Sequence, residues 1–202
     1  MLTALLDGRA RSAGELAFVA GISAQSASMH LAQLLQGGFV KVSREGRYRY
    51  YCLAGAQVAH AIESLGSMST PQEYRPLGAS QALCYARTCY DHLAGNLAVR
   101  LTAAWERKRF IVAQGEREYE LTGNGECWLR EWGIDADELR RSRRSFARRC
   151  LDWTERRDHL AGAVGAAICQ KLMEFHWITR DERSRAVHLS RTGERELARL
   201  LA

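Results

Sequence analysis

The sequence predicts a mainly α-helical fold with short β-hairpins, in which an N-terminal unit precedes a duplicated C-terminal one. Three observations support this prediction. Apolar residues recur at helical spacing within residues 12–36, one pentapeptide occurs twice in the second half, and the two prolines, Pro71 and Pro76, stand together in a polar stretch. Because proline interrupts helices, that stretch marks a boundary. We expect domains at 1–66 and 81–202, joined by a linker at 67–80.

The composition agrees with a folded chain. Of the 202 residues, 47% are hydrophobic and 26% are charged, which is enough to bury a core and excludes wholesale disorder. No apolar stretch is long enough to cross a bilayer and the N-terminus lacks a secretion signal, so we expect a cytoplasmic protein without a membrane partner. The six cysteines are then expected to be thiols. A net charge of +6 permits a polyanionic partner without identifying one.

Residues 12–36 predict two helices joined by a tight turn. Ser12 can cap the first helix, with Glu15 at capping-box spacing, and Ser23 can cap the second. The second helix carries an apolar stripe for the core at Ala27, Leu31, Leu34 and Leu35. Its opposite face carries short polar and amide side chains, which suit contacts to base edges and phosphates: Gln25, Ser26, Met29, His30 and Gln33. The pair Gly37-Gly38 ends the helix.

A basic β-hairpin is expected directly after these helices. Glu45-Gly46 forms its turn, between two runs that have the composition of strands. Arg44, Arg47 and Arg49 gather at the tip, where they would reach phosphates or a minor groove. Two helices followed by such a hairpin predict a winged helix-turn-helix.

The segment resembles the ArsR/SmtB family of bacterial winged-helix repressors over residues 3–66. The resemblance rests on a series of short motifs in a fixed order: Gly14-Glu-Leu-Ala17, Gly21-Ile-Ser23, Ser28-Met-His30-Leu31, Gly37-Gly-Phe-Val40, Arg44-Glu-Gly-Arg47 and Tyr50-Tyr51. It implies a homodimer that binds double-stranded operator DNA and leaves it when an inducer binds. It also implies that Gln25, Ser26, Ser28, Met29 and His30 read the DNA while the three hairpin arginines contact its backbone.

The chain departs from the family's pattern in several places. The family's first helix is short or missing, Met29 stands where a basic residue is common, and residues 1–51 contain no cysteine for the arsenic-type site. Of the zinc-type site only His60 and Glu63 occur. The family's familiar metal sites are therefore not carried over.

The C-terminal half repeats itself. Asp91-His-Leu-Ala-Gly95 recurs as Asp158-His-Leu-Ala-Gly162, and each copy starts a helical pattern that leads to a strand-like segment, a Gly-Glu pair and another helix. The offset is 67 residues at the pentapeptide and 68 at Gly125 and Gly193. An exact repeat with matching context predicts two winged-helix-like copies, at about 81–148 and 149–202.

Reactive side chains gather at the start of each copy: Cys84, Cys89, His92, Cys150, Asp152 and His159. A pseudo-two-fold arrangement would bring the two histidines together and Cys89 near Cys150, as a site for a soft metal ion. Three other interpretations stay open. Cys89 beside Arg87 could sense oxidants. A small organic ligand could lie between Tyr85, Tyr90 and Trp153, with Arg87, Arg156 or Arg157 as counter-charge. Or the Asp-His pairs cap helices and the cysteines merely pack.

These features predict a sequence-specific transcriptional regulator, a repressor released from DNA when the C-terminal domain senses a small molecule, a metal ion or an oxidant. No cofactor is firmly implied. The alternative is an interaction or scaffold protein built from degenerate winged helices that do not bind DNA. An enzyme is not expected, because the sequence lacks a phosphate-binding glycine loop, a Gly-x-Ser-x-Gly elbow and a His-Glu-x-x-His motif.

Overall fold

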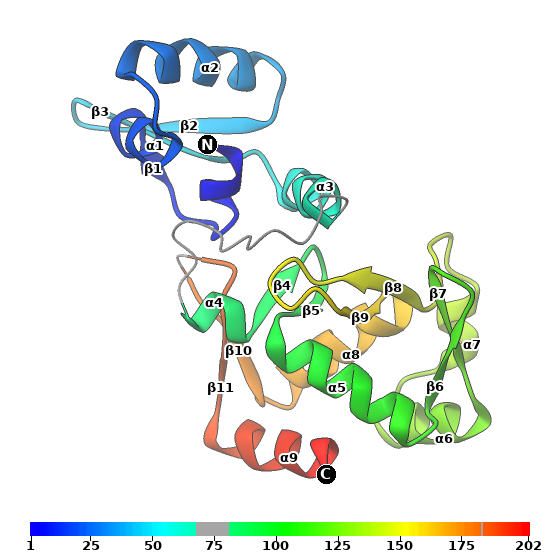
Figure 1. Ribbon diagram of the computed structural model, residues 1–202. Helices are drawn as coiled ribbons and strands as arrows, with labels where there is room; N and C mark the ends of the chain where they lie inside the picture. Colours follow the sequence, from blue (N-terminus) through cyan, green and yellow to red (C-terminus); the bar gives the residue numbers. More distant parts are fainter. Residues whose placement is uncertain (68–80, 183) are drawn as a thin grey trace.

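The computed structural model describes residues 1–67, 81–182 and 184–202, in an N-terminal unit and a larger C-terminal unit (Figure 1). The expected linker at 67–80, apart from Ser67, lies outside the described residues together with both prolines. In the part that is described, no helix combines the length and the apolar character that crossing a membrane requires. All six cysteines are described, and they are thiols rather than disulfides.

The N-terminal unit begins with a 3-10 helix at Leu2–Leu5. Then follow β1 (Arg11–Ser12), α1 (Ala13–Ala20), α2 (Ala24–Gln36), β2 (Val40–Glu45), β3 (Tyr48–Leu53) and α3 (Ala56–Ser67). The strands form one antiparallel sheet in the order β1-β3-β2. Two helices and a hairpin thus follow one another at the positions that the sequence predicts.

Local signals explain where these helices begin and end. Ser12 and Glu15 form a reciprocal capping box at the start of α1, and the side chain of Ser23 caps α2. Gly21 ends α1 in the left-handed conformation, with φ of 65°. Leu31 lies in the core, but Leu35 is 41% exposed, so the expected apolar stripe of α2 is wrong at that position. The stripe is narrower because only one side of α2 is covered, by α1 and β2.

The cap of α1 gives a first prediction. Ser12→Ala should lower the free energy of unfolding of this unit by about 1 kcal/mol, because the Glu15 amide loses the hydroxyl that accepts its hydrogen bond. Ser12→Gly should cost only a few tenths of a kcal/mol, since glycine is a tolerated cap. Thermal unfolding followed by circular dichroism compares the two variants. Equal losses would contradict the assignment of the cap.

In the C-terminal unit, four helices and four strands precede the expected boundary between the two copies. They are α4 (Gln81–Tyr85), β4 (Arg87–Cys89), β5 (His92–Ala94), α5 (Asn96–Arg107), β6 (Ile111–Gln114), β7 (Glu118–Leu121), α6 (Gly123–Glu131) and α7 (Ala136–Arg140). Those that follow are β8 (Arg148–Leu151), β9 (Asp158–Ala161), α8 (Gly162–Glu174), β10 (Ile178–Arg180), β11 (Val187–Leu189) and α9 (Arg191–Leu201). The strands pair as β4-β5, β6-β7-β8-β9 and β10-β11.

The order hairpin, helix, hairpin, helix therefore occurs twice, as β4 to α6 and as β8 to α9. Close contacts recur as well. A Cβ on Gly125 would meet the carbonyl of Phe110, and a Cβ on Gly193 would meet the carbonyl of Trp177. Thr122 caps α6 and Ser190 caps α9 in the same way, each accepting a hydrogen bond from the glycine three residues on.

Each copy of the repeated pentapeptide was predicted to start a helix, and this prediction is wrong. The first residues of the pentapeptide form the second strand of a hairpin, β5 in one copy and β9 in the other. The following helix begins at Asn96 in the first copy and at Gly162 in the second. The last residue of the pentapeptide, Gly95 or Gly162, has a positive φ in both copies, of 93° and 81°. The interpretation of the Asp-His pairs as helix caps is also wrong, because neither α5 nor α8 has a side-chain cap.

One hydrophobic core holds both copies together. It includes Leu97 and Leu101 of α5, Trp128 of α6, and Val164 and Ile168 of α8. Since side chains from both runs of elements share this core, the C-terminal unit folds as a single body.

Candidate functional site

The helix α2 presents a polar face to solvent. Gln25, Met29 and His30 are exposed, and Met29 is 56% exposed despite its apolar side chain. Figure 1 shows α2 at the end of the molecule that lies away from the C-terminal unit. The face is therefore accessible to a large partner.

The two serines of this face are partly engaged within the helix. Ser26 is half-buried, and its hydroxyl and amide both bond to the Ser23 hydroxyl of the cap. Ser28 is exposed, and its hydroxyl donates to the carbonyl of Ala24, 2.9 Å away. Gln25 and His30 thus offer the more available polar groups of the five predicted positions.

The hairpin formed by β2 and β3 carries the three arginines at its tip. Arg44 and Arg49 lie directly opposite each other in the antiparallel register. The turn consists of Gly46 and Arg47, one residue later than the predicted Glu45-Gly46, because Glu45 still pairs with Tyr48. All three arginines are exposed, and none takes part in the ion pairs found among the described residues. Like charges in opposed positions destabilise a hairpin, so an anion at this tip would relieve their repulsion.

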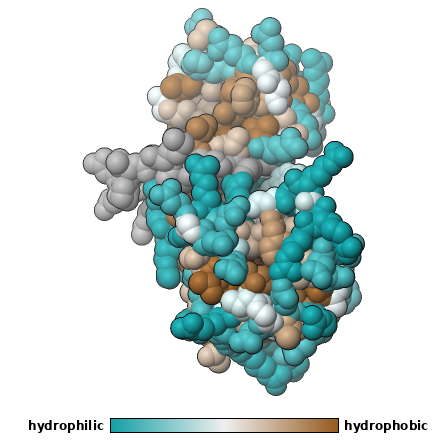
Figure 2. Space-filling model, turned by 90° about the vertical axis from the view of Figure 1, so that its right-hand side faces the viewer, coloured by the Kyte–Doolittle hydropathy of each residue, from teal (hydrophilic) through white to brown (hydrophobic). Residues whose placement is uncertain are grey.

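Apolar side chains are also exposed on the N-terminal unit. Phe18 of α1 is 88% exposed and Leu65 of α3 is 69% exposed. Figure 2 shows an apolar area on this unit with hydrophilic residues around it. Exposed apolar area of this kind is typical of a surface that contacts another protein.

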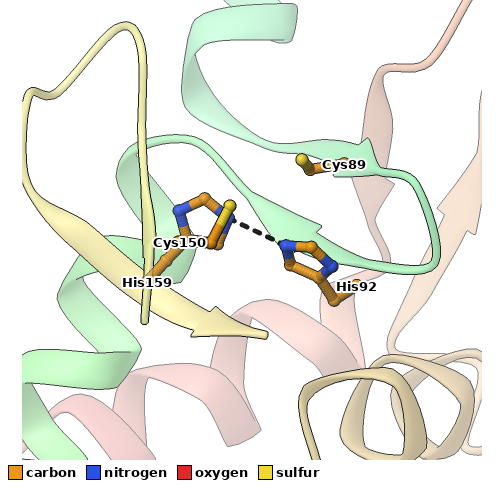
Figure 3. A group of neighbouring side chains, drawn as sticks. All are labelled: Cys89, His92, Cys150 and His159. Atoms are coloured by element: carbon orange, nitrogen blue, oxygen red, sulfur yellow. Dashed lines mark hydrogen bonds between the residues drawn. The ribbon is translucent and has the colours of Figure 1, made fainter. Parts of the chain in front are cut away.

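Four thiol and imidazole groups meet inside the C-terminal unit (Figure 3). They are Cys89 of β4, His92 of β5, Cys150 of β8 and His159 of β9, and all four are buried. In each hairpin the cysteine stands directly opposite the histidine, in the pairs Cys89–His92 and Cys150–His159. The four donor atoms all lie within 4.8 Å of one another. The predicted approach of the two copies is confirmed for these side chains.

The two imidazoles face each other through the same ring nitrogen. Nε2 of His92 lies 3.1 Å from Nε2 of His159, and the rings are stacked with centroids 5.1 Å apart. Each Nδ1 points toward a carboxylate. Nδ1 of His92 is 3.4 Å from Asp91, and Nδ1 of His159 is 3.7 Å from Asp152. The carboxylates therefore lie on the outer sides of the ring pair.

These contacts shift the pKa values of the groups around the cluster. Burial alone would lower the pKa of His92, but the Asp91 carboxylate and the Cys89 thiol beside it raise it to about 9. Burial raises the pKa of Asp91, yet its hydrogen bonds to His92 and Arg144 bring the net pKa below the usual value. Asp91 was not among the predicted site residues, although the repeated Asp-His pair was a signal for it.

The other two predicted site residues do not join the four donors. Cys84 of α4 is half-buried, and burial raises the pKa of its thiol. Asp152 is fully buried and forms an ion pair of 2.8 Å with Arg87, which is itself buried. Asp152 also accepts the amide of Gly95 at 2.7 Å. Its role is therefore to join the copies and to lie behind His159.

This ion pair removes Arg87 from the predicted organic-ligand site, for which Arg156 and Arg157 were the other candidate counter-charges. Arg87 is not available as a counter-charge, because it is buried against Asp152 and lies over the ring of Trp153, 4.6 Å from its centroid. Trp153 is 4% exposed and forms no accessible wall, whereas Tyr85 and Tyr90 are exposed. Cys127 is exposed.

A cavity of about 380 Å³ reaches the cluster from outside. His92, Asp91 and Ala161 line it together with Arg144, and Gln57 of α3 lines it from the N-terminal unit. The cavity therefore reaches His92, one of the four donors, at the place where the two units meet.

Comparisons with known proteins agree with the helix-turn-helix arrangement of α1 and α2. The chain is 39% identical over 202 residues to a protein of Bacillus subtilis (strain 168) described as "Uncharacterized HTH-type transcriptional regulator YdfF". The similarity covers 96% of this chain and 87% of that protein, so it includes the C-terminal unit. No family model and no solved structure matches the chain. The extent and level of this identity show that the chain belongs to the helix-turn-helix transcriptional regulators.

Proposed function

We propose that this protein is a repressor of the ArsR/SmtB type that binds double-stranded operator DNA sequence-specifically. The observation that carries the proposal is the exposed polar face of α2 together with the arginines of the adjoining hairpin. Helix α2 is the second helix of the pair and so takes the position of a recognition helix. The hairpin takes the position of a wing, and its arginines would contact phosphates.

The fold that we propose for this task is a winged helix-turn-helix at 1–66, followed by a duplicated winged-helix-like domain at 81–202. The repeated order of elements and the matching glycine contacts support the duplication. The 3-10 helix at Leu2–Leu5 takes the place of the longer first helix of the ArsR/SmtB family.

We also infer a homodimer as the active form. A two-fold dimer presents one recognition helix to each half of a pseudo-palindromic site. The exposed Phe18 and Leu65 support a protein contact on the N-terminal unit. A scaffold protein would use the same apolar surface for another partner, so the DNA experiment below separates the two functions.

The C-terminal unit is suited to effector sensing because it is bonded directly to the N-terminal unit. Arg185 donates from Nε to the carbonyl of Leu6 at 2.6 Å and from Nη1 to the carbonyl of Thr88 at 3.2 Å. Its amide donates to the carbonyl of Asp7 at 3.1 Å. A change near β4 can thus be transmitted to the DNA-binding unit.

The test is fluorescence anisotropy of the full chain on labelled DNA from upstream of its own gene, over a range of salt concentrations. The variant with Arg47→Ala and Arg49→Ala should bind every sequence more weakly, and its salt slope should fall by roughly 1 per lost phosphate contact. Gln25→Ala should instead change discrimination between bases, by about 1–3 kcal/mol.

The matched control is Arg195→Ala, which is compared with Arg47→Ala alone. Each of these two variants loses one exposed positive charge, but Arg195 lies in α9, far from α2 (Figure 1). It should leave the salt slope unchanged. Binding that is equal on operator and scrambled DNA, or an effect of Arg195→Ala as large as that of the hairpin arginines, would favour the scaffold function instead.

A further inference from the structure

The four buried donors form a set that simple packing does not require. The cysteines do contact Ala94 and Ala161, as small apolar residues would. The two buried imidazoles turn the same nitrogen, Nε2, toward each other at 3.1 Å. A hydrogen bond between them requires a proton on one Nε2 and uses the lone pair of the other, whereas a shared metal ion would bind the lone pairs of both.

We propose that Cys89, His92, Cys150 and His159 form a closed tetrahedral zinc site that joins the two copies of the C-terminal unit. The ligand atoms are the two Sγ atoms and the two Nε2 atoms. Two sulfur and two nitrogen donors in a tetrahedral arrangement are typical of zinc. Four protein ligands leave no open position, so the site binds the ion without catalysing a reaction.

The geometry fits an ion of this size. With Zn–N bonds of about 2.0–2.1 Å, two nitrogens of a tetrahedral site lie roughly 3.3 Å apart, and the two Nε2 atoms are 3.1 Å apart. The donor atoms lie within 4.8 Å of one another, so small rotations of the cysteine side chains complete the coordination. Two thiolates also balance the charge of Zn²⁺, which a buried site requires.

The surroundings orient the imidazoles as a metal site needs. Asp91 lies within hydrogen-bond distance of Nδ1 of His92, at 3.4 Å. Asp152 lies 3.7 Å from Nδ1 of His159, close enough to attract the ring but without a hydrogen bond to it. Carboxylates in this position fix the ring and favour coordination by the other nitrogen. The cavity that reaches His92 provides an entry path for the ion.

The position of the site suggests what the ion controls. Cys89 ends β4, and the carbonyl of Thr88 on the same strand accepts a hydrogen bond from Arg185, which also binds Leu6. Helix α3 of the N-terminal unit contacts β4 as well. Zinc bound at Cys89 therefore acts as the effector of DNA binding, an assignment that rests on the proposed function.

The metal site is tested on the reduced full chain with Co²⁺, a spectroscopic substitute for Zn²⁺. One Co²⁺ per chain should give the strong visible bands of tetrahedral coordination and a sulfur-to-cobalt charge-transfer band, and Zn²⁺ should displace it. Cys89→Ser and His159→Ala should each lower the affinity by more than the roughly 10–100-fold that loss of a supporting carboxylate costs. Cys84→Ser and Cys127→Ser should leave the spectrum unchanged.

A pair of aspartates provides a matched control for the supporting carboxylate. Asp91→Asn should weaken Co²⁺ binding by about 10–100-fold. Asp158 precedes His159 as Asp91 precedes His92, but its carboxylate pairs with Arg149, so Asp158→Asn should leave the affinity unchanged. Circular dichroism of each variant shows whether it is folded, and this comparison stands even if the cysteine variants fail to fold.

The site is overturned if the reduced protein binds no Co²⁺, or binds it with the spectrum of six oxygen ligands. It is also overturned if mass spectrometry finds a disulfide between Cys89 and Cys150, and if reduction of that disulfide does not restore metal binding.

Anisotropy on operator DNA with Zn²⁺ or with a chelator tests the effector role. A change of about 5-fold or more supports that role, and equal affinity overturns it. Absence of DNA binding in both conditions overturns the proposed function, while the cobalt spectra still decide the site.

Discussion

Asp152→Ala is expected to lower the free energy of unfolding by about 3–5 kcal/mol, because it leaves the Arg87 guanidinium buried without its carboxylate. The two side chains are 0% and 1% exposed, and they join residues 65 positions apart in the sequence. Asp152 accepts further hydrogen bonds from the amides of Gly95, Thr154 and Glu155. Its removal therefore leaves several buried donors without an acceptor.

Asp158→Ala is the matched control. Asp158 also pairs with an arginine, Arg149, but both side chains are about one-quarter exposed. Solvent screens such a pair, so the loss should be about 1 kcal/mol or less. Chemical denaturation of both variants at neutral pH gives the comparison. If Asp152→Ala were no more destabilising than Asp158→Ala, burial would not be what makes the Arg87–Asp152 pair important.

The contribution of Asp152 should also depend on pH in a defined direction. Burial raises the pKa of this carboxyl, but Arg87 and His159 lower it, and the net pKa lies below its usual value. A group with a lowered pKa stabilises the folded state above the unfolded pKa of about 4 and stops doing so as the pH falls through the folded value. The difference between wild type and Asp152→Ala should therefore be constant near neutral pH and shrink in acid.

Local chemistry made the N-terminal unit predictable from sequence. The capping residues Ser12 and Ser23 and the turn glycine Gly46 each fix the conformation of a few neighbouring residues, so their effects can be recognised without knowledge of the fold. The turn itself was predicted one residue too early, since Glu45 pairs with Tyr48. Leu35 was predicted wrongly because its burial depends on the width of the surface beneath α2, which is a tertiary property.

In the C-terminal unit the repeat predicted the meeting of His92 and His159 but not their supporting residues. Neighbouring residues on a strand point to opposite faces, so Asp158 of β9 cannot lie behind His159 and binds Arg149 instead. Asp91 precedes β5 and follows Tyr90, whose φ is 59°, so it can turn back toward His92. The same dipeptide thus has two roles, which its sequence does not distinguish.

Gly125→Ala and Gly193→Ala are each expected to destabilise the C-terminal unit by about 3 kcal/mol, at the upper end of the usual cost of overpacking. A Cβ on Gly125 would lie 2.1 Å from the carbonyl oxygen of Phe110, and one on Gly193 would lie 2.0 Å from that of Trp177. The obstacle is backbone in both cases, so no side-chain rotation relieves it. Each helix would have to move away from its hairpin.

Gly123→Ala in the same helix α6 separates this clash from a general effect of replacing glycine. Among the described residues, no atom outside the flanking residues and the backbone of α6 lies within 4 Å of a Cβ at Gly123, so alanine should stabilise the helix by about 0.4–1 kcal/mol. The midpoint of thermal unfolding should therefore shift in opposite directions for Gly123→Ala and Gly125→Ala.

Equal losses of unfolding free energy for Gly125→Ala and Gly193→Ala would show that the two hairpin–helix junctions are packed alike, as a duplicated domain requires. If only one of these two variants were destabilised, the junctions would differ. The duplication would then be supported only by the repeated order of helices and strands.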